Sequence, residues 1–124
     1  MVTHYVPPIS VTSKRLILDN EKLRRANAKV TTRATYKYGD LLTLSAANVL
    51  THATDESTWD VICGQDVSAA EATIKAADGI EIPVYYGGVF NVEAVSLDGT
   101  LLTTAQYDAA RAKATKNKIE LSMV

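Results

Sequence analysis

Short apolar runs, separated by turn-forming residues, dominate the chain from residue 35 onward. Such runs are typical of β-strands, in which successive side chains point to opposite faces of a sheet. The pattern predicts strands within these ranges: 41–44, 48–53, 59–64, 80–86, 89–95 and 119–124. We therefore expect a mainly β fold, with α+β as the upper limit of its helix content.

The pair Gly87-Gly88 lies between two of the predicted strands. Two glycines between strand-like runs are typical of a tight hairpin turn, so the sequence predicts a β-hairpin here. Pro83 lies in the strand before the turn and predicts an edge position or a bulge, because proline has no N–H to donate. The strand after the turn alternates, with Val89, Asn91, Glu93 and Val95 on one face and Phe90, Val92 and Ala94 on the other.

The segment 105–116, AQYDAARAKATK, breaks this β pattern. It consists mainly of helix-forming residues, and its Lys and Arg residues gather toward the C-terminal end, where the helix dipole favours positive charge. Thr103 or Thr104 is the expected cap. One short C-terminal helix is predicted, followed by a terminal strand that pairs into the domain.

Residues 1–13 show no sustained period and contain Pro7-Pro8, which favours extended backbone. We expect an extended N-terminal arm that becomes ordered only by docking. Residues 14–33 leave two alternatives open, a short helix capped by Asp19 or Asn20, or a solvated basic linker. The expected organisation is a flexible arm and basic linker over 1–33, followed by a compact domain over 34–124.

Charge divides the chain in the same way. Residues 1–33 contain seven of the thirteen Lys and Arg residues against Asp19 and Glu21, a net charge of +5. Since the whole chain carries −1, the remaining residues carry −6. The two parts are therefore expected to face different partners. The basic run 22–25 lacks stacking aromatics or a recognisable nucleic-acid module, so no specific nucleic-acid binding is expected.

Groups suited to catalysis or metal binding are few. Two histidines, His4 and His52, and the single Cys63 lack the spacing of a zinc site. Cys63 and His52 are a conceivable nucleophilic pair, but Cys63 lies in the apolar run 61–63, where a free thiol packs as a small hydrophobe. No nucleophile elbow or phosphate-binding glycine loop is present. We expect no enzyme, no cofactor and no metal.

Compartment and assembly follow from the remaining composition. The lone cysteine excludes an internal disulfide, and no apolar run approaches the roughly 20 residues of a membrane span. We expect a soluble protein of a reducing cytoplasm without a membrane partner. The apolar residues are mostly small, with one Phe and one Trp, so the core is modest and self-association is expected to supplement it.

Three stretches together resemble the head decoration proteins of lambda-like tailed bacteriophages. They are 39–44 with the following NVL run, YYGGVFNVEAV at 85–95, and AQYDAARAKATKNKIELSMV at 105–124. The resemblance covers roughly residues 35–124, and the arm is similar in character. Two parts depart from the family pattern. The stretch before Tyr36 is richer in Arg and Lys, and segments 54–58 and 64–75 do not align with it.

The resemblance implies a β-clip-like domain that forms a homotrimer on the outside of an expanded phage capsid, at three-fold and pseudo-three-fold sites. There it would stabilise the shell against the pressure of packaged DNA. The implied partner is the major capsid protein, and the implied location is the virion exterior after assembly of this late protein in the host cytoplasm. The alternative is another phage structural component, such as a tail or head-completion protein. The arm residues expected to bind the capsid are Val2, Thr3, His4, Tyr5, Val6, Pro7, Pro8, Ile9, Val11, Lys14 and Arg15.

Overall fold

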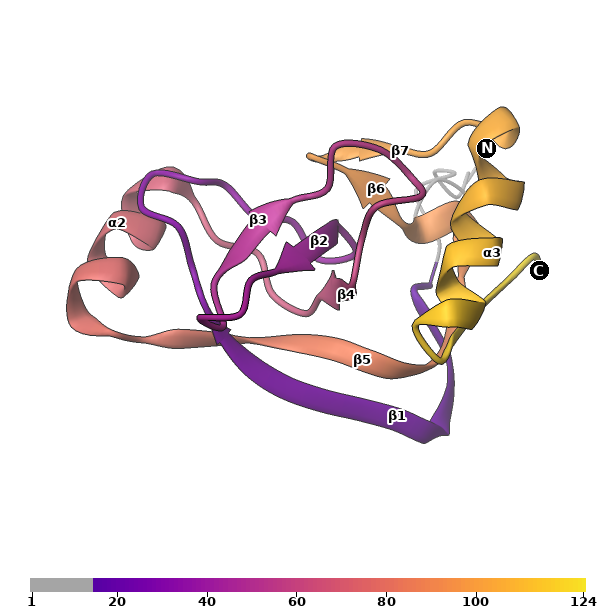
Figure 1. Ribbon diagram of the computed structural model, residues 1–124, viewed down its shortest axis with the longest axis horizontal. Helices are drawn as coiled ribbons and strands as arrows, with labels where there is room; N and C mark the ends of the chain where they lie inside the picture. Colours follow the sequence, from indigo (N-terminus) through magenta and orange to yellow (C-terminus); the bar gives the residue numbers. More distant parts are fainter. Residues whose placement is uncertain (1–14) are drawn as a thin grey trace, which may run out of the picture.

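The computed structural model describes residues 15–124, which form a mainly β domain with a helix near the C-terminus (Figure 1). The fold class expected from the sequence is thereby confirmed. The elements are β1 (Ile17–Lys29), β2 (Leu41–Leu44), β3 (Leu50–His52), β4 (Val61–Cys63), α2 (Ala69–Asp78), β5 (Glu81–Asn91), η1 (Val92–Ala94), β6 (Ser96–Leu97), β7 (Thr100–Leu101), η2 (Thr104–Gln106), α3 (Tyr107–Lys116) and β8 (Ile119–Ser122).

The long strand β5 organises the main sheet. Strand β1 pairs antiparallel along one edge of β5, and the order continues through β4 and β2 to β3. Strand β4 pairs with Val84 and Tyr85, whereas β8 pairs in parallel with the stretch from Gly88 to Asn91. Two short strands therefore share the second edge of β5. Strands β6 and β7 form a separate two-stranded hairpin.

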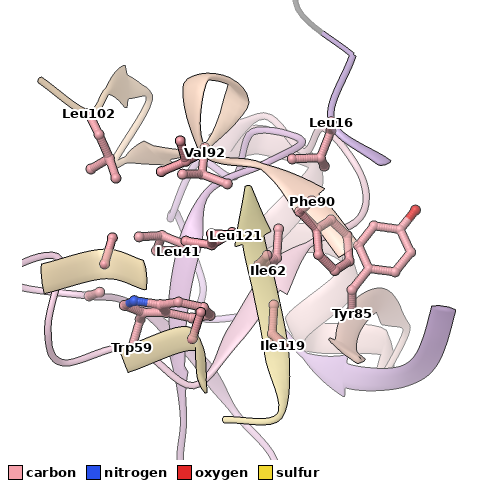
Figure 2. Close-up of a cluster of buried hydrophobic side chains, with 14 residues drawn as sticks. Leu16, Leu41, Trp59, Ile62, Tyr85, Phe90, Val92, Leu102, Ile119 and Leu121 are labelled. Atoms are coloured by element: carbon pink, nitrogen blue, oxygen red, sulfur yellow. The ribbon is translucent and has the colours of Figure 1, made fainter. Parts of the chain in front are cut away.

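The centre of the sheet is buried on both faces. Neighbouring residues of β2 point to opposite sides, so that Leu41 belongs to one apolar cluster and Leu42 to the other. The first cluster lies under α3 and β8 (Figure 2), and its largest members are Trp59, Tyr85, Phe90, Ile62, Ile119 and Leu121. The second cluster includes Tyr36, Leu50, Cys63, Ile82, Val84 and Ala72 of α2. Burial on both faces explains why β4 reads as an uninterrupted apolar run.

The predicted C-terminal helix and terminal strand are confirmed as α3 and β8. The Thr103 N–H donates to Oε1 of Gln106 at 2.8 Å, which caps the turn that leads into the helix. Ala110 and Ala114 are the buried residues of α3. Their small side chains let the helix approach the first cluster closely.

The hairpin predicted at Gly87-Gly88 is wrong, because β5 runs straight through both glycines. The pairing with β1 shifts register at this point: Asp19 lies opposite Val89, and Arg24 lies opposite Gly87. Five steps along β1 thus span two steps along β5, so residues 20–23 bulge outward. Gly88 has a φ of 130°, a conformation that favours glycine. The glycines serve a β-bulge instead of a turn.

Two neighbouring expectations along β5 also need correction. Pro83 lies inside this central strand and not at a sheet edge, and its carbonyl accepts the Gly64 N–H at 3.0 Å. The alternation predicted for 89–95 ends at Asn91, because η1 begins at Val92. Val92 and Val95, predicted on opposite faces, are both buried in the first cluster. A 3-10 turn rotates successive side chains by about a third of a turn, which destroys the strand alternation.

Residues 17–29 form strand β1, so both the helix and the linker expected within 14–33 are wrong. Pairing with β5 decides the conformation: Ala28 lies opposite Ile82 and is fully buried. Tertiary contacts thus override the local helix preference. The boundary expected after residue 33 would separate β1 from its partner strand, and β1 belongs to the compact domain. The arm expected over 1–13 lies outside the described residues.

Helix α2 was not predicted. Ser68 caps its N-terminus, since Ser68 Oγ accepts the Glu71 N–H at 3.1 Å and the Ser68 N–H donates to Glu71 Oε1 at 2.8 Å. Gly79 ends the helix with a φ of 69°. The spacing Ser68-x-x-Glu71 is the sequence signature of this cap, and it was available in the sequence.

Candidate binding surface on the first strand

The predicted arm residues cannot be compared with the structure, because all of them except Arg15 lie outside the described residues. Arg15 is exposed, and the adjoining Leu16 is 3% exposed within the first cluster. The Leu16 carbonyl also accepts the Asn91 N–H at 2.8 Å. The chain is therefore anchored to the sheet at Leu16, immediately before β1.

Strand β1 carries four exposed basic residues. We call Lys22, Arg24, Arg25 and Lys29 the basic strand surface; all four are exposed. None of them forms an ion pair with a carboxylate of residues 15–124. The aliphatic stem of Arg24 lies over Gly87, where an added Cβ would meet Arg24 Cδ at 3.0 Å. The sequence identified these charges but assigned them to a linker, whereas the structure holds them on a paired strand.

Aromatic rings continue this surface across the sheet. The Arg25 guanidinium carbon lies 5.9 Å from the centre of the Tyr85 ring, within the range of a cation–π contact. Tyr38 meets Tyr85 edge-on, with ring centres 6.3 Å apart. Burial, together with a hydrogen bond to Tyr85, raises the pKa of Tyr38 to about 12. The exposed part of Tyr38 therefore offers a neutral hydroxyl beside the Arg25 cation at physiological pH.

A groove lies where β1 bulges away from β5. It is lined by residues 86–89, by residues 21–24, and by Thr115 and residues 117–120. The volume is about 1270 Å³, above the range of roughly 300–1,000 Å³ common for small-molecule pockets. We call it the Gly87 groove. Its charged lining residues are Lys22, Arg24, Lys118, Glu21 and Glu120.

A second polar cluster surrounds the buried carboxylate of Asp40, which is 1% exposed. Oδ1 accepts the Gly99 N–H at 2.9 Å and the Ser96 hydroxyl at 2.5 Å, and Oδ2 accepts the Lys37 N–H at 2.9 Å. Asp40 thereby joins the turn before β2 to the β6–β7 hairpin. Sequence reasoning missed this cluster, because Gly39-Asp40 reads as an ordinary turn.

His52 lies beside this cluster, and its ring stacks on Tyr36. Its Nε2 is 2.5 Å from the Thr35 carbonyl oxygen, and its buried Nδ1 is 3.9 Å from Asp40 Oδ2 without a hydrogen-bond partner in the described chain. A catalytic triad needs a histidine that accepts the serine proton. Here Ser96 donates to Asp40, so the three side chains do not form that relay.

The conceivable nucleophile Cys63 is fully buried. Burial raises the pKa of the Cys63 thiol to about 12, and the thiol donates to the Gln65 carbonyl at 3.0 Å. Since the thiolate is the reactive form, Cys63 is inert at neutral pH. It packs in the second cluster, as its place in an apolar run indicated.

Within residues 15–124, no group of three or more His, Cys, Asp or Glu side chains is arranged to hold a metal ion. The helices of this range are all too short or too polar to cross a bilayer. Comparison with protein-family models and with curated proteins found no match to the chain. The features that bear on function are therefore the basic strand surface, the groove and the sequence resemblance.

Proposed function

We propose that the chain is a head decoration protein that binds the outside of an expanded phage capsid as a homotrimer, at three-fold and pseudo-three-fold sites. There it stabilises the shell against internal DNA pressure. The resemblance of residues 35–124 suggests this class. The observation that carries the proposal is the basic strand surface on β1, whose four side chains form no ion pair with a carboxylate of residues 15–124 and which directly follows the segment that the sequence assigns to capsid binding.

The geometry favours joint action of the arm and the strand. Because Leu16 is buried and hydrogen-bonded to Asn91, the segment before it is tethered at one end of β1. A capsid surface that binds this segment therefore lies within reach of Lys22, Arg24 and Arg25. Positive charge there steers and orients the approach to an acidic capsid edge, while the arm supplies affinity. Three arms on one trimer multiply a weak contact through avidity.

Cosedimentation with purified expanded shells tests the proposal. The variant lacking residues 1–14 keeps Leu16 and β1, and we expect it to fold and self-associate but no longer sediment with the shells. Removal of residues 1–33 would be uninformative, because it deletes a strand of the sheet. Undiminished binding of the shorter truncation would refute the proposal.

A charge-reversal variant tests the contribution of the strand. Arg25→Glu combined with Lys29→Glu changes two exposed side chains that do not line the Gly87 groove, and we expect weaker binding in about 0.1 M salt. The difference should shrink in about 1 M salt, where the screening length falls from ~10 Å to ~3 Å. Lys37→Glu combined with Lys116→Glu changes two exposed lysines outside β1, and this control should bind normally. Electron microscopy should place the bound protein at three-fold positions; binding confined to the tail or one vertex would favour the alternative component.

A further inference from the structure

Helix α2 presents an apolar stripe that the described chain does not cover. Ala72 is its one buried residue, and it faces the second cluster. On the other side, Ala70, Ile74 and Ala77 are exposed and follow the four- and three-residue spacing of one helix face. Ile74 is 60% exposed, and Ile80, just beyond the helix, is 44% exposed. Two large aliphatic side chains are thus exposed to solvent, one on α2 and one directly after it.

The stripe is held in a defined shape. Ser68 and Glu71 cap one end of α2 reciprocally, and Gly79 closes the other with its N–H donating to the Lys75 carbonyl. A ten-residue helix is marginal by itself, so these caps matter for its order. The helix lies at one end of the long axis of the molecule, opposite α3 (Figure 1). Such a preorganised apolar face suits docking into a groove.

The Gly87 groove offers matching space. Two helical turns with small side chains, ~10 Å across, occupy roughly 850 Å³, which the groove volume of about 1270 Å³ accommodates. Gly87 and Gly88 contribute no side chains to its lining. Leu23 and the 43% exposed Tyr86 provide apolar contact within it. The groove borders α3, so it lies toward the opposite end of the molecule from α2 (Figure 1).

The charges of the two surfaces are complementary. The groove lining has three basic residues, Lys22, Arg24 and Lys118, against Glu21 and Glu120. Helix α2 has the opposite balance, with Glu71 and Asp78 against Lys75. The three basic groove residues form no ion pair within residues 15–124. Helix α2 of a second copy offers both an apolar stripe and a charge balance opposite to that of the groove.

We propose that α2 of one copy docks in the Gly87 groove of the next copy, in a head-to-tail contact. Because the two surfaces differ and lie at opposite ends of the molecule, each copy donates a helix and accepts another. Contacts of this kind generate a ring when the rotation closes. The inference rests on the self-association that the proposed function requires, and it names the surfaces that would form the subunit contact.

Complementation between two defective variants tests the contact by size-exclusion chromatography with light scattering. Wild type is expected to be oligomeric. Ile74→Asp removes the helix surface, and Tyr86→Asp with Lys118→Glu removes the groove surface, so each variant alone should be monomeric. An equimolar mixture retains one intact helix and one intact groove. It should form a heterodimer and nothing larger.

Several outcomes would overturn the inference. They are a monomeric wild type, wild-type assembly by the Ile74→Asp variant, a mixture that stays monomeric, and self-association of the groove variant alone, as a symmetric contact between two α2 helices would give. Leu101→Asp is the matched control, because Leu101 is 55% exposed on β7, and it should leave assembly unchanged. A cooperative unfolding transition in urea checks that each variant is folded. Ile80→Asp is a second variant on the helix side of the contact and should also be monomeric.

Shell binding distinguishes the two proposals from one another. If wild type sediments with shells but Ile74→Asp assembles normally, the head-to-tail contact is wrong and the proposed function stands. If the complementation succeeds but wild type does not sediment with shells, the proposed function is wrong and the contact stands. Ile74→Asp monomers are expected to bind shells at least tenfold more weakly than wild type, because avidity is lost.

Discussion

Replacement of Asp40 by alanine should be among the most destabilising single changes in the domain. The carboxylate is 1% exposed and accepts three hydrogen bonds, from the backbone N–H groups of Lys37 and Gly99 and from the Ser96 hydroxyl. These donors belong to segments far apart in the sequence. Alanine leaves all three donors without their acceptor, between the turn before β2 and the β6–β7 hairpin.

The magnitude follows from the cost of unsatisfied buried donors. Each costs about 1–3 kcal/mol, and the Ser96 hydroxyl recovers part of this loss by rotating toward another acceptor. We therefore expect Asp40→Ala to lower the free energy of unfolding by ~3–5 kcal/mol. Asp40→Asn should cost less, roughly 1–3 kcal/mol, because the amide keeps one oxygen acceptor but turns an N–H₂ group toward one donor.

Urea unfolding followed by tryptophan fluorescence measures this effect through Trp59, the only tryptophan of the chain. The midpoint should fall while the slope stays constant, which identifies a change in stability with an unchanged two-state transition. Asp60→Ala is the control, since Asp60 is exposed and its carboxylate accepts only the Leu44 N–H among the described contacts. A loss for Asp40→Ala no larger than for Asp60→Ala would refute the structural role of the buried carboxylate.

Three further predictions concern backbone, helix cap and thiol. Gly88→Ala should lower the free energy of unfolding, measured in urea, by about 1–3 kcal/mol, because φ is 130° and the added Cβ would lie 3.2 Å from the side chains of Leu23 and Phe90. Gly79→Ala is the control and should cost less, because no atom lies within 4 Å of a Cβ added there. Hydrogen bonds from the backbone and side chain of Ser68 hold the pKa of Glu71 below its usual value. Stabilisation by this cap should therefore be present at neutral pH and lost as pH falls through the lowered pKa, and an NMR titration of Glu71 that gave the ordinary value would contradict this. Cys63 should resist a thiol reagent at pH 8 in the folded protein and react fully in urea, since burial raises its pKa to about 12.

Part of the basic strand surface could be predicted from the sequence alone. The basic residues of 14–33 and the contrast with the acidic remainder are properties of composition, so they needed no structure. Their arrangement was not predictable. The segment LDNEKLRRANAK has helix-forming residues, and only the pairing with β5 converts it into a strand. The Gly87 groove depends on the same pairing, because it lies where the β1 register shifts.

The exposed stripe of α2 had a detectable local signal that was overlooked. The Ser68-x-x-Glu71 cap marks the start of the helix, and Gly79 marks its end. That Ile74 faces solvent could not be deduced, because an apolar residue at helical spacing is normally buried. Which face of a short helix meets the core depends on the neighbouring elements.

The sequence by itself determined the mainly β class, the C-terminal helix with a cap at Thr103 or Thr104, and the terminal strand, because these follow from side-chain periodicity and local hydrogen bonding. Only the tertiary structure decided the conformation at Gly87-Gly88. Two glycines permit either a hairpin or a bulge, since both use backbone angles that other residues avoid. Partners on both edges of β5 make the continuous strand the favoured choice. Pairing between segments far apart in the chain is a property of the whole fold, and no local pattern encodes it.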